Sequence, residues 1–192
     1  IPKDLDIKVA WLVEPLAVVG QGVRRVLACS ASPEKKCAVI GAGPIGNLCV
    51  QVLAAKGYDV TVFDKNPDRL EYLKNKATCR NDLVGLDDFP IIVEAVGDEN
   101  ILKKVLMESK EGSTLLLLGF PYGEISFNFE NLVAHGKTIV GSVGSRSEDF
   151  RWALNQLNEI DYEFFIKEVM PLNDFDKAWE LHRSGKHLKI IL

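Results

Sequence analysis

The stretch AVIGAGPIGNLCVQVLAAKGYDVTVFD, residues 38–64, decides the fold. A short apolar run leads into three glycines at the G-x-G-x-x-G spacing, Gly41, Gly43 and Gly46, and a helical pattern and a second apolar run follow. This order is typical of a dinucleotide-binding β-α-β unit. Gly41 permits a tight turn, Gly43 the close approach of a pyrophosphate, and Gly46 the packing of the helix on the sheet. The stretch therefore predicts a pyrophosphate at the start of this helix.

An acidic residue, Asp64, ends the second apolar run, 23 positions after Gly41 (64 − 41). This spacing is close to the roughly 20 residues expected for the carboxylate that binds the ribose hydroxyls. A carboxylate at this place repels a 2′-phosphate, which favours NAD over NADP. The cations Lys65 and Arg69 would weaken the repulsion, so use of both cofactors stays open. The alternative, a turn in another kind of α/β protein, is disfavoured by the strand and helix patterns on both sides.

The composition narrows the class of protein. The chain has 192 residues, 47% of them hydrophobic, and a formal net charge of −4. It is long enough for one packed domain with a small appendage, and its acidity argues against a nucleic-acid partner. Neither a membrane span nor a signal peptide is expected, because charged residues interrupt every long apolar run. The four cysteines form no C-x-x-C pair, which favours reduced thiols and a cytoplasmic location.

Strand-like and helix-like segments alternate along the rest of the chain. Apolar runs predict further strands at residues 89–96, 113–118 and 138–143, with helices over residues 68–76, around 101–106 and from 147. Near-continuous apolar strands are expected where helices cover both faces of a parallel sheet. The pattern thus predicts an α/β fold, a Rossmann doubly wound parallel sheet of strand order 3-2-1-4-5-6. Asn66, Asp98 and Ser147 are expected to cap the helices that follow them.

Two further segments flank this sheet. An amphipathic helix begins near Pro15, and its Gly20 and Gly22 indicate the close approach of either a neighbouring element or a ligand. After residue 160 the chain reads as a strand over residues 163–169, a helix and a final strand over residues 187–192. This tail is either an extra edge of the same domain or part of a second lobe.

Six motifs then carry a family resemblance over essentially the whole chain. They are WLVEPLAV, AVIGAGPIG, IIVEAVG, LLLLGF, NLVAHGKTIVGSVG and PLNDFDKAWELHRSGKHLKIIL. The chain resembles the zinc-containing medium-chain dehydrogenases, and among them the archaeal glucose 1-dehydrogenases. The resemblance implies a connecting segment from the catalytic lobe at residues 1–36 and a dinucleotide-binding Rossmann domain at residues 37–160. It implies that residues 161–192 return to a GroES-like catalytic lobe that the chain otherwise lacks.

The resemblance also implies a set of cofactor-binding residues. They are Gly41, Gly43, Pro44, Ile45, Gly46, Asp64, Lys65, Ala95, Gly97, Leu118, Gly119, Phe120, Ser142, Val143 and Gly144. Residues 118–120 match the rim around the nicotinamide, and residues 142–144 match its far wall. The family often has an asparagine where this chain has Gly144, so a carboxamide contact at that position is not expected to carry over.

For metal binding, the resemblance points to one residue. Glu14, in the E-P-L motif, matches a glutamate that the family places next to the catalytic zinc. The family's cysteine, histidine and second glutamate ligands have no match here, so the zinc site is incomplete and no catalytic residue is assigned. The alternative for Glu14 is a carboxylate that favours the dipole at a helix start. His135, His182 and His187 are expected to be surface or packing residues.

The resemblance implies the cofactor domain of an NAD(P)-dependent sugar or polyol dehydrogenase that contains zinc when complete. In such an enzyme the metal polarises the sugar C1 hydroxyl while hydride passes to the nicotinamide, and the fragment alone is expected to be inactive. Two alternatives stay open: a zinc dehydrogenase for another sugar or alcohol, and a non-catalytic dinucleotide-binding module. The expected partners are a small sugar substrate and a second copy of the chain at the sheet edge around residues 138–143, with no nucleic acid or membrane.

Overall fold

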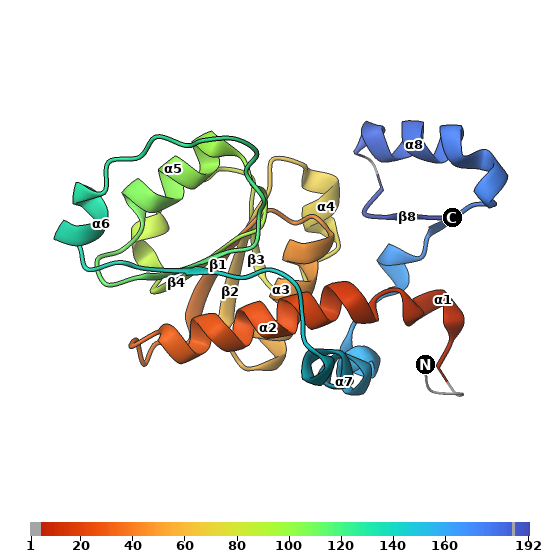
Figure 1. The fold of residues 1–192 in the computed structure, drawn as a ribbon, viewed down its shortest axis with the longest axis horizontal. Helices are drawn as coiled ribbons and strands as arrows, with labels where there is room; N and C mark the ends of the chain where they lie inside the picture. Colours follow the sequence, from red (N-terminus) through yellow and green to blue (C-terminus); the bar gives the residue numbers. More distant parts are fainter. Residues whose placement is uncertain (1–4, 186) are drawn as a thin grey trace.

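The computed structural model describes residues 5–185 and 187–192. Its centre is a six-stranded parallel sheet of order β3-β2-β1-β4-β5-β6 (Figure 1). The strands are β1 (Lys36–Ile40), β2 (Asp59–Phe63), β3 (Thr78–Arg80), β4 (Ile91–Glu94), β5 (Thr114–Leu117) and β6 (Thr138–Gly141). The predicted strand order and the doubly wound α/β class are confirmed.

Consecutive residues of the central strands pack into two different hydrophobic clusters. In β1, Cys37 and Val39 belong to one cluster, whereas Ala38 and Ile40 belong to the other. Because side chains alternate between the faces of a strand, this division shows that both faces of the sheet are covered. The first cluster contains side chains of α2 (Val13–Cys29), α3 (Pro44–Ala55) and α7 (Ser147–Gln156), and the second contains side chains of α5 (Glu99–Glu108). Figure 1 shows α2 and α7 on one side of the sheet and α5 on the other.

The other helices before the tail are short. They are α1 (Ile7–Ala10), α4 (Pro67–Glu71), α6 (Glu130–Ala134) and the 3₁₀ turns η1 (Leu86–Asp88) and η2 (Leu157–Glu159). In the part of the chain that the structure describes, no helix is long and apolar enough to cross a membrane.

Several local predictions can be compared with the structure. The side chain of Asn66 accepts a hydrogen bond from the Asp68 amide at 3.0 Å, and Asp98 caps α5 in the same way, so both predicted caps are confirmed. The cap predicted at Ser147 is wrong, because Arg146 is the N-cap residue and Ser147 is the first helical residue. The helix predicted over residues 68–76 ends early, at Glu71, and turns follow it.

Gly20 and Gly22 of α2 lie against side chains of neighbouring elements. A Cβ atom at Gly20 would lie 2.2 Å from the ring of Trp152 on α7. One at Gly22 would lie 3.0 Å from the side chain of Leu118, which follows β5. Of the two alternatives raised by these glycines, the structure therefore supports the neighbouring element. Their small size lets α2 pack closely on both α7 and the sheet.

The tail forms a small two-stranded sheet of its own. β7 (Glu168–Val169) and β8 (Ile190–Ile191) pair in parallel, and α8 (Phe175–Ser184) lies between them in the chain after the 3₁₀ turn η4 (Leu172–Asp174). Figure 1 shows α8 and β8 away from the six-stranded sheet. The strand predicted over residues 163–169 begins instead as the 3₁₀ turn η3 (Glu163–Phe165), and the predicted final strand is shorter than residues 187–192.

A buried carboxylate joins α2 to the start of α7. Asp149 is fully buried, and its Oδ1 accepts a hydrogen bond from Arg24 at 2.6 Å while its Oδ2 accepts one from the Arg146 amide at 2.8 Å. Burial alone would raise the pKa of Asp149, but these hydrogen bonds and the charges of Arg24 and Arg146 outweigh it and hold the pKa below its usual value. A carboxyl group of this kind stabilises the fold while it is ionised, and the stabilisation is lost as the pH falls through its folded-state pKa.

Replacing Asp149 with asparagine should lower the free energy of unfolding by about 1–3 kcal/mol near neutral pH, because a charged hydrogen bond to Arg24 is lost. The wild-type chain should lose stability as the pH falls below about 4, since the unfolded chain then binds more protons, and the variant should lose less. Urea unfolding at several pH values measures both effects. The exposed Glu148, which lies 3.7 Å from Arg24, is the matched control, and a loss at Glu148→Gln as large as that at Asp149→Asn would contradict the prediction.

Candidate functional site

A cavity of about 390 Å³ lies at the carboxyl ends of β1, β2 and β4. The chain leaves β1 toward β2 on one side, whereas β4 pairs with β1 on the other side. In open α/β sheets, this point where the strand order reverses is where ligands bind. The cavity is lined by Ile40, Gly41, Gly43, Phe63, Asp64, Lys65, Arg69, Asn81, Leu83, Ala95, Val96, Asp98 and Ile101.

The three glycines of the fingerprint occupy three different environments. Gly41 has a φ of +95°, and a Cβ atom there would lie 2.7 Å from the side chain of Val96. A Cβ atom at Gly46 would lie 1.8 Å from the carbonyl oxygen of Gly41, so α3 packs directly on the turn. At Gly43, by contrast, a Cβ atom would have no contact within 4 Å. The open side of Gly43, at the N-cap of α3, leaves room for the backbone to receive a pyrophosphate.

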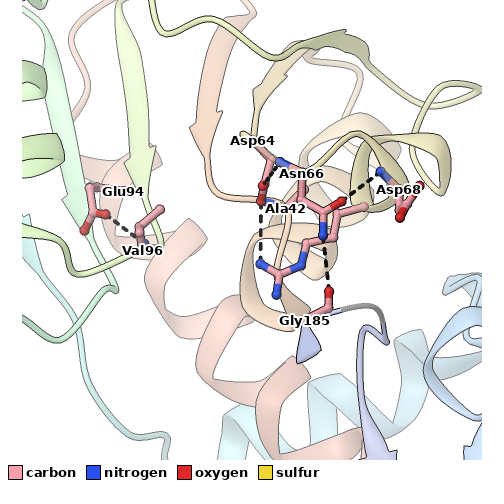
Figure 2. Close-up of polar contacts among 8 residues, drawn as sticks. Ala42, Asp64, Asn66, Asp68, Glu94, Val96 and Gly185 are labelled. Carbon is pink, nitrogen blue, oxygen red and sulfur yellow. Dashed lines mark hydrogen bonds and ion pairs between the residues drawn. The ribbon is translucent and has the colours of Figure 1, made fainter. Parts of the chain in front are cut away.

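Asp64 lies beside this loop (Figure 2). Its Oδ2 accepts a hydrogen bond from the Ala42 amide at 2.7 Å, and its Oδ1 accepts one from the Asn66 amide at 2.8 Å. Each carboxylate oxygen has a second acceptor site, so both can still accept a ribose hydroxyl. The guanidinium of Arg69 lies 3.9 Å from Oδ2, and its buried Nε has no hydrogen-bond partner among the described residues. One carboxylate with a cation next to it therefore lines the cavity.

The predicted nicotinamide side lies outside this cavity, along the ends of β5 and β6. A Cβ atom at Gly97 would lie 2.7 Å from the backbone nitrogen of Phe120, so the loops after β4 and β5 are in direct contact. The carbonyl of Val143 accepts a hydrogen bond from Gln21 at 3.4 Å. Ser142 has a buried hydroxyl without a partner among the described residues. Gly144 is exposed, with a φ of +70° and open space where a side chain would be.

A second cavity, of about 580 Å³, connects the fingerprint to the amino end of α2 and to the tail. It is lined by Trp11, Glu14, Pro15, Pro44, Ile45, Lys189, Ile190, Ile191 and Leu192. Glu14 is exposed in the first turn of α2, so its carboxylate also favours the helix dipole. The structure therefore brings the candidate metal residue close to Pro44 and Ile45 and away from Asp64.

The described residues do not form a zinc site. Among them, no three or more His, Cys, Asp or Glu side chains are grouped as metal ligands would be. A catalytic zinc needs three protein ligands, and the candidate residue Glu14 would be one at most. All four cysteines are free, as the sequence predicts, and burial raises the pKa of Cys37 to about 12, which keeps this thiol protonated.

Eight residues that line the first cavity are absent from the predicted set. Ile40, Phe63 and Arg69 lie at or after the ends of β1 and β2, and the other five are Asn81, Leu83, Val96, Asp98 and Ile101. Of these five, Leu83, Val96 and Ile101 are apolar and form a wall of the kind that an adenine base packs against. They follow the carboxyl ends of β3 and β4, which is the signal that could have identified them. That signal was hidden for Asn81 and Leu83, because β3 has only three residues and no apolar run.

One more ionisable group lies beneath the site. Glu94 ends β4, is 1% exposed, and accepts hydrogen bonds from the amides of Val96 and Gly97. Burial raises the pKa of Glu94, the two amides lower it, and the nearby charge of Asp98 raises it further, with a net increase.

Comparison with known proteins identifies the family. Residues 7–192 match the family described as glucose dehydrogenase C-terminus, and the chain belongs to it. It is 32% identical to L-threonine 3-dehydrogenase of Bacillus subtilis (strain 168) over 209 residues, which cover 100% of this chain and 59% of the relative. It is also 32% identical to glucose 1-dehydrogenase 2 of Vulcanisaeta moutnovskia (strain 768-28) over 200 residues, which cover 93% of this chain and 57% of the relative.

A similar fold occurs in the crystal structure of a short chain alcohol dehydrogenase from Escherichia coli CFT073 complexed with NADH. The TM-score is 0.82, with 21% identity, over 97% of this chain and 59% of that chain. At this identity the likeness concerns the fold alone. The resemblance to glucose 1-dehydrogenases that the motifs indicate is confirmed. The chain spans less than two thirds of the length of these relatives.

Proposed function

We propose that this chain is the cofactor-binding part of an NAD(P)-dependent sugar or polyol dehydrogenase similar to glucose 1-dehydrogenase. The complete enzyme would transfer hydride from a sugar C1 to the nicotinamide. The observation that carries the proposal is the hydrogen bond from the Ala42 amide to Asp64, since it joins the glycine turn to the ribose carboxylate at the rim of one cavity. The names of the relatives support the reaction class.

The cofactor would lie across the ends of the strands. Its adenosine would occupy the first cavity, with the ribose hydroxyls donating to Asp64 and the adenine against Val96 and Ile101. The pyrophosphate would lie on the open side of Gly43. The nicotinamide would reach the backbone near Leu118 and the hydroxyl of Ser142, which has no partner among the described residues. These residues bind and orient the cofactor, and the cofactor supplies the hydride chemistry.

This placement of the cofactor gives each segment of the chain a role. We assign residues 37–160 to cofactor binding, residues 1–36 to the connection with a catalytic lobe, and residues 161–192 to the return toward it. The separate β7–β8 pair supports the last boundary. In the complete enzyme Glu14 would face the metal, and the other zinc ligands would belong to the catalytic lobe. The free thiols favour a reducing, cytoplasmic location.

NADH should bind more tightly than NADPH, by about tenfold or more, because the Asp64 carboxylate repels a 2′-phosphate. Calorimetric titration of the 192-residue chain with each cofactor measures this ratio. Asp64→Asn should bring the affinities for NADH and NADPH closer together, since it removes the charge. Because general damage to the loop would weaken both cofactors alike, the ratio of the two affinities isolates the effect of the charge. Equal or tighter binding of NADPH by the wild-type chain would contradict the assignment of Asp64. If neither cofactor binds, the proposed function is wrong.

A non-catalytic dinucleotide-binding module is the second candidate, and it is favoured by the lack of a metal-ligand group among the described residues. Mixing the chain with zinc, NAD and glucose should give cofactor binding without turnover. Turnover at an enzyme-like rate would show that the catalytic groups are present in this chain, contrary to the assignment of a separate lobe. Assaying the same mixture with the full-length protein, if its reading frame encodes further zinc ligands, distinguishes the enzyme from the module.

The edge strand β6 is the candidate contact with a second copy of the chain. It ends the six-stranded sheet, and Thr138, Ile139 and Gly141 are exposed along it. An uncovered edge offers unpaired backbone groups to another strand. Light scattering coupled to size-exclusion chromatography should detect a dimer, and Ile139→Lys should shift it toward the monomer, whereas a monomeric wild-type chain would exclude this contact.

A further inference from the structure

Glu94 accepts hydrogen bonds from two loops that carry predicted cofactor residues, the loop after β4 and the loop after β5. Its Oε1 accepts hydrogen bonds from the amides of Val96 at 2.7 Å and Gly97 at 2.9 Å, in the loop after β4. Its backbone carbonyl accepts from the amides of Leu118 at 2.9 Å and Gly119 at 3.0 Å, in the loop after β5. Figure 2 shows the Glu94 side chain directed at Val96. One residue therefore ties together two segments that lie more than twenty positions apart in the chain.

The two loops leave no space for a larger residue at their contact. A Cβ atom at Gly119 would lie 2.2 Å from the backbone nitrogen of Gly97 and 2.5 Å from Oε2 of Glu94. Gly97 has a φ of +77°, so two successive amides turn toward one oxygen and form a small anion-binding concavity. The protein's own carboxylate fills this concavity. The loops pack backbone against backbone, with the carboxylate directly beneath them.

Packing alone does not account for a carboxylate in this position. Burying a charged group costs free energy, and an apolar residue of similar size would often stabilise the fold as well or better. What an apolar residue could not do is accept the two amide hydrogen bonds that shape the turn at Val96 and Gly97. Val96 lines the first cavity, and Gly97 contacts the backbone of Phe120 on the nicotinamide side. The shape of both halves of the site thus depends on this turn.

We propose that Glu94 is a positioning residue that holds the loops after β4 and β5 in the arrangement that receives the cofactor. Its side chain sets the adenine wall at Val96, and through the contact of Gly97 with Phe120 it sets the nicotinamide rim. Glu94 does not touch the cofactor itself. This inference rests on the proposed function, because it concerns how the same site is held open for a dinucleotide.

Two substitutions test the role of the side chain. Glu94→Leu removes the acceptor and keeps a similar volume, whereas Glu94→Gln keeps one acceptor oxygen for the two amides. Calorimetric titration with NADH and with AMP, below the unfolding temperature of each variant, gives the affinities and the fraction of competent protein. We expect Glu94→Leu to bind NADH about tenfold or more weakly and AMP more weakly as well, and Glu94→Gln to stay within about threefold of the wild-type chain.

The outcomes separate the two proposals. If the wild-type chain binds neither NADH nor AMP, the proposed function falls and this inference falls with it. If the wild-type chain binds but Glu94→Leu binds with the same affinity and full stoichiometry, Glu94 has a structural role alone and the inference is overturned. If Glu94→Leu does not fold, Glu94→Asp replaces it, because the shorter side chain cannot reach both amides. Weaker NADH binding by folded Glu94→Asp, restored in Glu94→Gln, supports the inference, and unchanged binding overturns it.

Discussion

Replacing Gly46 with alanine should lower the affinity for NADH by about a hundredfold and the stability by about 3 kcal/mol. The new Cβ atom would lie 1.8 Å from the carbonyl oxygen of Gly41 and 2.8 Å from its carbonyl carbon. Both are backbone atoms of the turn, so neither can move aside as a side-chain end would. Relief of the overlap requires α3 to shift away from the turn, which would carry the pyrophosphate-binding amides with it. Urea unfolding and calorimetric titration with NADH measure the two losses.

Gly43→Ala is the matched control, in the same loop and with the same added methyl group. A Cβ atom there would have no contact within 4 Å, and the φ of −66° is accessible to alanine. Stability should therefore change by less than about 0.5 kcal/mol, while NADH binds about tenfold more weakly because the methyl group occupies the side that the pyrophosphate approaches. If Gly43→Ala binds NADH as the wild-type chain does, the pyrophosphate does not lie on this loop. If Gly46→Ala is as stable as the wild-type chain, the close contact with Gly41 is not a constraint.

Gly20→Ala should destabilise the fold by about 2–3 kcal/mol. Its Cβ atom would lie 2.2 Å and 2.4 Å from two ring carbons of Trp152, a side chain held between α2 and α7. Either the indole ring would have to turn out of its place or the two helices would have to separate, and both changes disturb the packing on one face of the sheet. Thermal and urea unfolding measure the loss, and the NADH titration shows whether the nicotinamide side, which α2 contacts through Gln21 and Gly22, is displaced as well.

A second substitution tests the cause of this loss. Trp152→Leu vacates the ring position, so the alanine at position 20 should cost much less in that background, with a coupling of about 1–2 kcal/mol in the double-mutant cycle. Gly141→Ala is the control, since a Cβ atom there has no contact within 4 Å. A full, additive loss in the Trp152→Leu background would show that Gly20 is needed for another reason.

Much of the fold was predictable because its signals are local. The apolar runs that became β1, β4 and β5 are nearly continuous, since both faces of the sheet are buried, and the fingerprint glycines mark the turn between β1 and α3. The short strand β3 was not located, because Thr78, Cys79 and Arg80 have no apolar pattern and pair through their backbone with β2. The cap at Ser147 was misplaced because a carboxylate two residues on, Asp149, accepts the hydrogen bond from the Arg146 amide.

The candidate site divides in the same way. The placement of Gly41, Gly43 and Asp64 around one cavity was predictable, because their spacing is typical of the backbone geometry that a pyrophosphate and a ribose require. The cavity wall formed by Leu83, Val96 and Ile101 was not, since these residues meet only when β3 and β4 end at the same edge of the sheet.

The sequence by itself determined the β-α-β unit around residues 38–64, because its signals are short-range spacing and apolar periodicity. The alternation of strands and helices indicated the doubly wound class and its strand order, and the resemblance of the motifs indicated the family. Only the tertiary structure shows which groups pack against each glycine. Trp152 packs against Gly20, the Gly41 carbonyl against Gly46, and the loop after β5 against Gly97. Only the tertiary structure also shows that the Glu94 side chain accepts hydrogen bonds from two amides and that Asp149 accepts one from Arg24. These contacts join residues that are remote in the chain or set by a tight turn, and a buried charge acquires its partners only when the surrounding elements are packed.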